Sequence, residues 1–406
     1  MSQIGLSLVP HPVLVLVLAL AACGRAPSEG SRLEAPIHWI ATTDGDGVAS
    51  ETALPFASGL PEDTLSVTVV ADSPSFDLLA IGVSDAAGRT WIDAAAPEGS
   101  PNRMIPGRRA AVAMLPSTPA ALPLGPRFHV GARLSPTGGG GAGAGAGGQT
   151  VALTAFIKRA AGDVRYPAVR IAPAVQQLSS TLFLVTDKVA EDVRLLRALS
   201  EMGRILRAAG IETAEPARVR LAGPDLVRFE RVGVGPPLGR DSPELGDLLS
   251  LAGSTPDAGL PIFLVPSLTS GVGAMVLGVS ASIPAAPIPG TPRSGVVISA
   301  DAIPFDPLLA GQVMAHEVGH ALGLFHTTEA EADGPRDQID DTPVCPPDAD
   351  GAAGSAHSPP LPDGILTTEE CEGFDASNLM FWATARGADR LTAGQGEILR
   401  RSPLAR

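Results

Sequence analysis

The sequence of 406 residues is poor in several residue types, and each shortage excludes a class of protein. Basic side chains are outnumbered: 29 Lys and Arg stand against 43 Asp and Glu, which gives a formal net charge of -14. Nucleic acids and anionic membrane surfaces attract clustered Lys and Arg, so this balance argues against both as partners. Tyrosine occurs once, while glycine and proline number 46 and 39. That composition favours short strands and irregular connections over a helical bundle.

The apolar run near the N-terminus, Val13–Ala22, is too short to span a bilayer comfortably. It ends in small residues before Cys23, as a secretory signal does. Leu20-Ala21-Ala22-Cys23 resembles the lipobox of bacterial lipoproteins, in which the cysteine is lipidated. The residues before the run include no Lys or Arg, so an ordinary signal peptide is the alternative. We therefore expect residues 1–23 to direct export, giving a cell-envelope lipoprotein anchored to the membrane at Cys23, or a secreted protein.

Cysteine is scarce too, with Cys345 and Cys371 as the two others. If Cys23 carries lipid, an even pair remains in an oxidising compartment, where a disulfide is the simplest expectation. Two free cysteines are the alternative.

The chain divides into segments of different composition. Residues 24–34 are small and polar, as expected of a flexible tether. From 35 to 160, alternating apolar and polar segments recur between turn residues, which predicts an antiparallel β-sandwich. A glycine tract at 137–150 is interpreted as an enlarged hairpin loop within that sandwich. We expect the boundary to the next domain between residues 159 and 177.

From residue 175 to 406 the pattern changes to alternating strands and helices. Residues 180–189 and 294–301 predict buried strands. A strong helix signal follows the first of these, and residue 210 is a glycine at its expected stop. Its apolar residues at helical spacing are Val193, Leu196, Leu199, Met202 and Leu206. The fold class expected for the whole chain is therefore α+β, with the β-sandwich first.

Three of the seven histidines lie in the short stretch "HEVGHALGLFH". On an α-helix, His316 and His320 lie one turn apart on the same face, so both imidazoles can bind one ion. Glu317 then lies beside the first. This pattern is typical of a Zn²⁺ site in which the glutamate takes a proton from a metal-activated water.

His326 follows the second histidine by six residues and cannot reach the same ion if the helix runs straight on. Gly323 stands where the chain must turn, because glycine accepts a positive φ at little steric cost. Three histidine ligands with an open fourth position indicate a catalytic zinc site, whereas a structural site has four protein ligands. Histidines buried in a core without a metal are the alternative.

On these residues the chain resembles the metzincin metalloendopeptidases, carried on a bacterial lipoprotein-like precursor. The resemblance implies that His316, His320 and His326 bind zinc, that Glu317 is the general base, and that Met380 forms a hydrophobic floor. It also implies a twisted mixed sheet with a backing helix, an active-site helix and a loop-rich C-terminal subdomain. Substrate is expected to lie extended along an edge strand, supplied by "GAMVLGVSASIP" or "SGVVISAD".

Within the metzincins the pattern is most similar to the pappalysin or cytophagalysin type. "DDTPVC" follows the zinc helix, a later cysteine precedes Met380, and "RLTAGQGEILRRS" resembles the closing helix of that type. The similarity implies a disulfide between Cys345 and Cys371. It also implies calcium near the site, with Asp333, Asp337, Asp340 and Asp341 as candidate oxygen ligands. The chain departs from several metzincin families at Trp382, where they have a tyrosine; an indole can donate a hydrogen bond but cannot ligate zinc.

The expected function is therefore an exported zinc endopeptidase acting on protein or peptide substrates, with the β-domain as a binding module or a propeptide. One alternative is a catalytically weak or inactive zinc-containing surface lipoprotein, an adhesin or scaffold. Trp382 and the lack of the cysteines for the second disulfide usual in the pappalysin type are the features that motivate it. Another is a gluzincin-type protease whose third ligand is Glu369 or Glu370.

Overall fold

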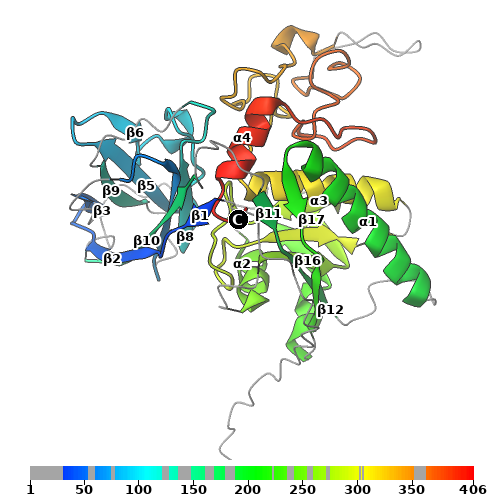
Figure 1. Ribbon diagram of the computed structural model, residues 1–406, viewed down its shortest axis with the longest axis horizontal. Helices are drawn as coiled ribbons and strands as arrows, with labels where there is room; N and C mark the ends of the chain where they lie inside the picture. The colour runs from blue at the N-terminus through cyan, green and yellow to red at the C-terminus, as the bar shows by residue number, and fades with distance from the viewer. Residues whose placement is uncertain are drawn as a thin grey trace, which may run out of the picture.

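The computed structural model describes residues 31–53, 60–74, 78–120, 128–135, 148–160, 169–178, 188–221, 224–235, 242–253, 259–270, 275–300, 303, 306–351 and 363–406 (Figure 1). The signal segment with Cys23, the first residues of the tether, and most of the strand expected at 180–189 lie outside these residues. Within the described part, no helix combines the length and the apolar character that a bilayer span requires. The α+β class is confirmed, with many strands and few helices.

Two antiparallel sheets form the N-terminal part of the molecule. The first contains β1 (Arg32–Leu33), β2 (Ile37–Thr42), β4 (Thr64–Asp72), β8 (Ala110–Leu115) and β10 (Thr150–Arg159). The second contains β3 (Val48–Ala53), β5 (Leu78–Asp85), β6 (Thr90–Ile92), β7 (Gly107–Arg108) and β9 (Phe128–Ser135). Alternate residues of both sheets, such as Val67 and Val69 on β4 and Ile81 on β5, share one buried core. These ten strands and their connections are called the N-terminal β-body below.

Two expectations for this region need correction. The strands on either side of the glycine tract do not pair: β9 pairs with β3 and β5, and β10 pairs with β1, β2 and β4. The connection therefore crosses from one sheet to the other, and the hairpin interpretation is wrong. In addition, the end of the expected tether is a strand, because Arg32 and Leu33 pair with Arg159 and Lys158 of β10.

A mixed five-stranded sheet forms the centre of the second part, in the order β14-β12-β16-β20-β19. The four strands β14 (Ala217–Leu221), β12 (Pro173–Leu178), β16 (Leu260–Val265) and β20 (Val296–Ser299) are parallel. The edge strand β19 (Gly278–Ser280) runs antiparallel to β20. β20 confirms the strand expected at 294–301. The continuous apolar sequence of β16 is buried throughout, as expected of a parallel strand covered on both faces.

Smaller sheets border this one. β11 (Val169–Ile171) pairs in parallel with β13 (Ile211–Thr213), and β17 (Ser267–Ser270) joins β15 (Arg231–Val234) to β18 (Met275–Val276). The stretch 159–177, expected to be a connection, therefore contains β11 and most of β12. Pro173 does not interrupt β12, because it is the first residue of that strand, a position proline tolerates.

Helices α1 (Lys188–Ala208) and α3 (Pro307–Ala321) pack against each other beside the mixed sheet (Figure 1). Helix α2 (Pro243–Leu249) packs against β15. Val193 and Leu196 on α1 are exposed. The buried apolar side chains of the helix are Leu195, Ala198, Leu199, Met202, Ile205 and Leu206. The buried face of α1 therefore includes three of the five residues predicted for it, Leu199, Met202 and Leu206. Gly210 has a φ of 80°, which confirms it as the stop of α1.

After α3 the chain is irregular until α4 (Ala393–Arg401). A disulfide joins Cys345 to Cys371 across 26 residues and confirms that prediction. Both sulfurs lie in a small separate core with Leu366 and Phe381. Figure 1 shows α4 between the N-terminal β-body and the rest of the molecule.

Candidate metal centre

Helix α3 carries the first two histidines into the interior. Its N-cap is Asp306, whose carboxylate accepts from the backbone N–H groups of Leu308 and Leu309. Residues 310–321 are all buried, including His316 and His320. The burial of both polar and apolar faces indicates that this helix is covered on every side, where an imidazole needs a partner.

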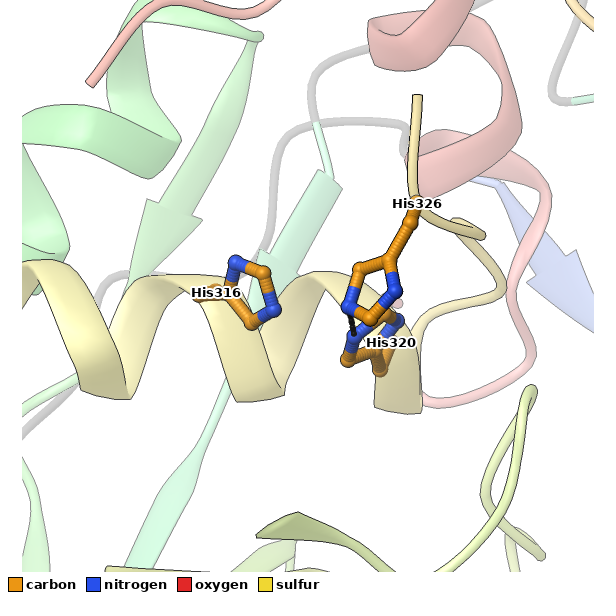
Figure 2. Close-up of side chains that lie close together, drawn as sticks. All are labelled: His316, His320 and His326. Atoms are coloured by element: carbon orange, nitrogen blue, oxygen red, sulfur yellow. Dashed lines mark hydrogen bonds between the residues drawn. The ribbon is translucent and has the colours of Figure 1, made fainter. Parts of the chain in front are cut away.

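The chain reverses just beyond the helix. Leu322 ends α3, and Gly323 follows with a φ of 114°, where an L side chain would be strained. The Leu324 N–H donates to the carbonyl of Gly319 at 3.0 Å, which closes the last turn. The reversal carries His326 back, so that its Nε2 lies 3.0 Å from Nε2 of His320. Figure 2 shows His326 reaching from beyond the helix toward the two histidines on it.

Each of the three imidazoles has a partner at its outer nitrogen. Nδ1 of His316 lies 2.6 Å from the carbonyl oxygen of Leu379. Nδ1 of His320 lies 2.7 Å from the carbonyl oxygen of Leu324, and Nδ1 of His326 lies 2.8 Å from Oε2 of Glu329. These acceptors require a proton on Nδ1, which leaves each Nε2 lone pair for a metal ion. One ligand atom from each ring lies within 4.8 Å of the others, so the three residues fit a zinc ion.

Burial keeps these groups in the protonation states that such a site needs. It lowers the pKa of His316 to about 3 and that of His320 well below its usual value, with the neighbouring imidazoles adding to both effects. Both rings are therefore neutral at physiological pH, as metal ligation requires. Glu317 is 8% exposed. Burial raises its pKa to about 8, and the backbone N–H of Ser280 opposes that rise.

The edge strand β19 lies directly against Glu317. A Cβ atom placed on Gly278 would lie 2.7 Å from Cγ and 3.0 Å from Oε1 of Glu317. The strand and the carboxylate therefore share one face of the molecule. Of the two stretches proposed for the edge, "GAMVLGVSASIP" supplies it, while "SGVVISAD" forms β20 inside the sheet.

Met380 lies under the helix, fully buried. Its sulfur would lie 2.7 Å from a Cβ on Gly319, so the absence of a side chain there allows this close approach. The backbone N–H of Met380 donates to Asn378 at 2.8 Å, and its carbonyl accepts from Thr327 at 3.0 Å. The residue before it, Leu379, is the partner of His316. The turn thus holds both the floor of the site and the orientation of one imidazole.

Trp382 points into the disulfide core instead. Its Nε1 donates to the carbonyl of Leu366 at 2.7 Å, and its ring packs against the core that contains Cys345 and Cys371. The indole N–H is committed to that carbonyl in the structure.

The other candidate ligands do not join the histidines. Among the described residues, the four aspartates expected to bind calcium do not form a cluster of three converging ligand atoms. Asp341 instead accepts from Thr392 and Gly394. Asp337 accepts from Thr342 at 2.8 Å, and burial raises its pKa to about 7. Glu370 accepts from Gly351 and Thr367, and neither it nor Glu369 belongs to the histidine group.

Three residues that the sequence analysis did not single out support the site. Glu329 lies three residues after His326, a spacing that could have marked it as a partner. Asp375 is buried and accepts from the hydroxyls of Thr327 and Thr328, which fixes the chain just after His326. Arg103 of the N-terminal β-body lies 3.9 Å from Glu329, and no local pattern marks it.

Part of the chain is similar in sequence to a known metalloprotease. No protein-family model matches the chain. An extracellular metalloprotease from Verticillium alfalfae is 34% identical over 110 residues, which is 23% of this chain and 39% of that protein. The chain therefore spans well under half the length of this relative.

Mature mirolysin from Tannerella forsythia, solved with a cleaved peptide, is similar at 16% identity and a TM-score of 0.31, covering 57% of this chain and 90% of that one. Metalloproteinase-II from Bacteroides fragilis has 12% identity and a TM-score of 0.22, covering 45% and 55%.

Proposed function

We propose that the chain is a zinc endopeptidase of the metzincin type, similar to the pappalysins, that hydrolyses protein or peptide substrates. The observation that carries the proposal is the convergence of three Nε2 atoms, from two residues on α3 and one beyond a glycine reversal, with each Nδ1 already engaged. A histidine buried in a core without a metal needs a hydrogen-bond partner, but that need does not explain why three imidazoles face one another. The local match to an extracellular metalloprotease supports the same activity.

His316, His320 and His326 would hold the zinc, which when bound supplies Lewis-acid polarisation of a water and of the scissile carbonyl. Glu317 would accept the proton of the attacking water and return it to the leaving amine. Its buried position next to His316 on α3 suits a group that exchanges a proton with a water held there. Met380 and Gly319 would keep the floor beneath the imidazoles in close contact.

Substrate would bind along β19. This strand pairs with β20 on one side, and it is the last strand of the sheet among the described residues. An extended peptide could add to its free side by backbone hydrogen bonds. The scissile bond would then pass close to Glu317, because that carboxylate lies against Gly278.

Export is part of the proposal. The disulfide between Cys345 and Cys371 forms and persists in oxidising compartments, and the relative in Verticillium alfalfae is named as extracellular. Anchoring through a lipid on Cys23, the domain limits 35–160 and 175–406, and calcium binding remain predictions from the sequence.

The function is tested with the purified chain, its Glu317→Ala variant and a control variant at an exposed glutamate, Glu62→Ala. We expect one zinc per chain in all three, peptide-library cleavage by the wild type and Glu62→Ala, and cleavage by Glu317→Ala reduced by at least about 100-fold. Zinc content and product formation by mass spectrometry are measured on the same samples.

Equal cleavage by the wild type and Glu317→Ala would contradict the proposed mechanism. Bound zinc in a wild type that cleaves no peptide would favour the inactive surface lipoprotein instead.

A further inference from the structure

We propose that the N-terminal β-body is a permanent part of the metal centre, in which Arg103 positions the third histidine through Glu329, and not a removable propeptide. The inference rests on the proposed function for the identity of the metal. It extends that function, because it assigns a role to a part of the chain that carries none of the metal ligands.

Arg103 lies at the contact between the N-terminal β-body and the turn that follows α3. Its side chain is 4% exposed, and its guanidinium lies 4.4 Å from the ring centroid of Phe325, the residue before the third histidine. Nη2 lies 3.9 Å from Oε1 of Glu329, while Oε2 of the same carboxylate lies 2.8 Å from Nδ1 of His326. The two oxygens of Glu329 thus connect a cation of the N-terminal β-body to a candidate ligand.

The loop at residues 100–103 of the N-terminal β-body also contacts the backbone that follows His326. Nη1 of Arg103 lies 3.5 Å from the carbonyl oxygens of both Pro335 and Arg336. Nε2 of Gln338 donates to the carbonyl of Ser100 at 3.1 Å. The segment is in turn tied to the site, since the N–H of Asp337 donates to the carbonyl of His326 at 2.8 Å. Movement of the loop at residues 100–103 would therefore displace His326 in two ways: through the side chain of Glu329, and through the backbone of residues 335–337.

The N-terminal β-body also packs against the reversal itself. Met114 of β8 is 1% exposed and belongs to the core of the second part of the molecule. Its terminal methyl would lie 2.6 Å from a Cβ on Gly323. The side chain therefore fills the space over the turn that brings His326 back to the helix.

Buried cations join the two parts at three further places. Nζ of Lys158 on β10 donates to the carbonyls of Arg400, Ser402 and Ala405. Arg401 on α4 donates in the opposite direction, to the carbonyls of residues 118, 119 and 120. Arg293 donates to the carbonyl of Ala110 on β8 at 3.2 Å.

Release of the N-terminal β-body would deprive these cations of their acceptors and expose the core around Met114. Removing one partner from a buried charge is strongly destabilising, whereas a propeptide must leave an active enzyme behind. The buried cations and the shared core therefore indicate a permanent interface between the two parts.

The role of Arg103 is to hold Glu329 so that its carboxylate keeps the third imidazole in the binding orientation. Outer partners of metal ligands typically change metal affinity or activity by about 10- to 100-fold when they are removed. The effect should fall on zinc binding and on turnover, and leave the affinity for peptide unchanged.

The test uses the full chain and three variants: Arg103→Met, which keeps an apolar stem but removes the charge and its donors, Arg103→Lys, and Glu329→Gln. Arg89→Met is the matched control, because Arg89 also lies in the N-terminal β-body and stacks on an aromatic ring, Trp91, at 4.2 Å, but is exposed. The measurements are zinc affinity by chelator competition, the visible spectrum with Co²⁺ in place of zinc, kcat and KM on a peptide, and thermal unfolding.

We expect Arg103→Met and Glu329→Gln to weaken zinc binding by about 10- to 100-fold and to alter the Co²⁺ spectrum, with kcat lowered and KM unchanged. Arg103→Lys should recover part of the affinity, and Arg89→Met should match the wild type. A fourth variant combines Arg103→Met with Glu329→Gln. It should bind zinc no more weakly than the weaker of the two single variants, because the two residues act in series.

Wild-type zinc affinity in Arg103→Met would overturn the proposal. So would an active enzyme whose mass shows that residues 31–160 have been lost. If Arg103→Met is too unstable to measure, Arg103→Lys and Glu329→Gln decide, and wild-type affinity in both overturns it. The affinity and the Co²⁺ spectrum need no peptidase activity, so these results are independent of the Glu317→Ala experiment.

Discussion

At the scale of single residues, missing side chains decide how closely the elements around the histidine group approach one another. Gly311 lets α3 pack on α1, where a Cβ would lie 2.6 Å from the carbonyl oxygen of Ala198. Gly319 admits the sulfur of Met380 in the same way, and Gly278 admits Glu317. The glycines thus define the space around the histidine group as firmly as the bulky residues do.

Gly278→Ala should reduce turnover without removing the metal. The new methyl would lie 2.7 Å from Cγ of Glu317 and 2.9 Å from Cγ1 of Val313, so the carboxylate must shift. A displacement on the order of 1 Å in a reacting group costs about 100-fold in rate. Peptide turnover and zinc content are measured beside Gly45→Ala, since a Cβ on Gly45 would meet nothing within 4 Å. Wild-type turnover in Gly278→Ala would show that Glu317 is not held by the edge strand.

At the scale of elements, α3 and the reversal after it act as one unit. The helix supplies two imidazoles at a spacing of one turn, and the reversal at Gly323 supplies the third. This unit could be predicted from the sequence because the geometry is local: helical periodicity and one glycine determine it. For the same reason the strands β4, β5, β8, β9 and β10 match alternating segments read from the sequence.

Gly323→Ala tests the reversal. The residue needs a φ of 114°, and its Cβ would meet the methyl of Met114 at 2.6 Å. Gly387→Ala is the control: it has a φ of 90° with nothing within 4 Å of its Cβ, so it carries the backbone strain alone, on the order of 1–3 kcal/mol. Gly323→Ala should lower the melting temperature further than Gly387→Ala, and it alone should weaken zinc binding. If both variants lost the same amount in melting temperature and both kept their zinc affinity, the contact between Gly323 and Met114 would be unimportant.

Pairings between distant elements were not predictable from the sequence. Nothing near His316 indicates that its outer nitrogen faces the carbonyl of Leu379, 63 residues away. The glycine tract between β9 and β10 suggests a hairpin by proximity, yet the strands join different sheets. Arg103 looks like any loop arginine until the fold places it on Phe325. Long-range contacts depend on how whole elements pack, which local patterns do not encode.

At the scale of the whole molecule, two large cores meet across a contact made partly of buried cations. Lys158 is 2% exposed, and burial lowers its pKa to about 7, with the charge of Arg400 adding to the effect. In the unfolded chain a lysine titrates near pH 10.4. The folded protein therefore binds fewer protons than the unfolded chain between these two pH values, and its stability rises with pH across that interval. Below about pH 7 both states are protonated, and the cost of burying the charge stays constant.

Lys158→Met should remove this dependence. The wild-type free energy of unfolding should gain up to about 1.4 kcal/mol per pH unit relative to the variant as the pH rises above 7. Urea unfolding between pH 7 and 9.5 measures the difference, and Arg197→Met, at an exposed position of α1, is the control that should follow the wild type. A difference that stays constant with pH would mean that the ammonium remains charged in the folded protein.

The three acceptors behind the imidazoles differ in one respect that matters for engineering. Two are main-chain oxygens, at Leu324 and Leu379, which no side-chain replacement deletes. The third is the carboxylate of Glu329, which a single codon can turn into an amide, an alcohol or a methyl group. If the three histidines hold a metal as proposed, Glu329 is therefore the position at which one substitution can change how the residue beyond the helix, His326, binds it.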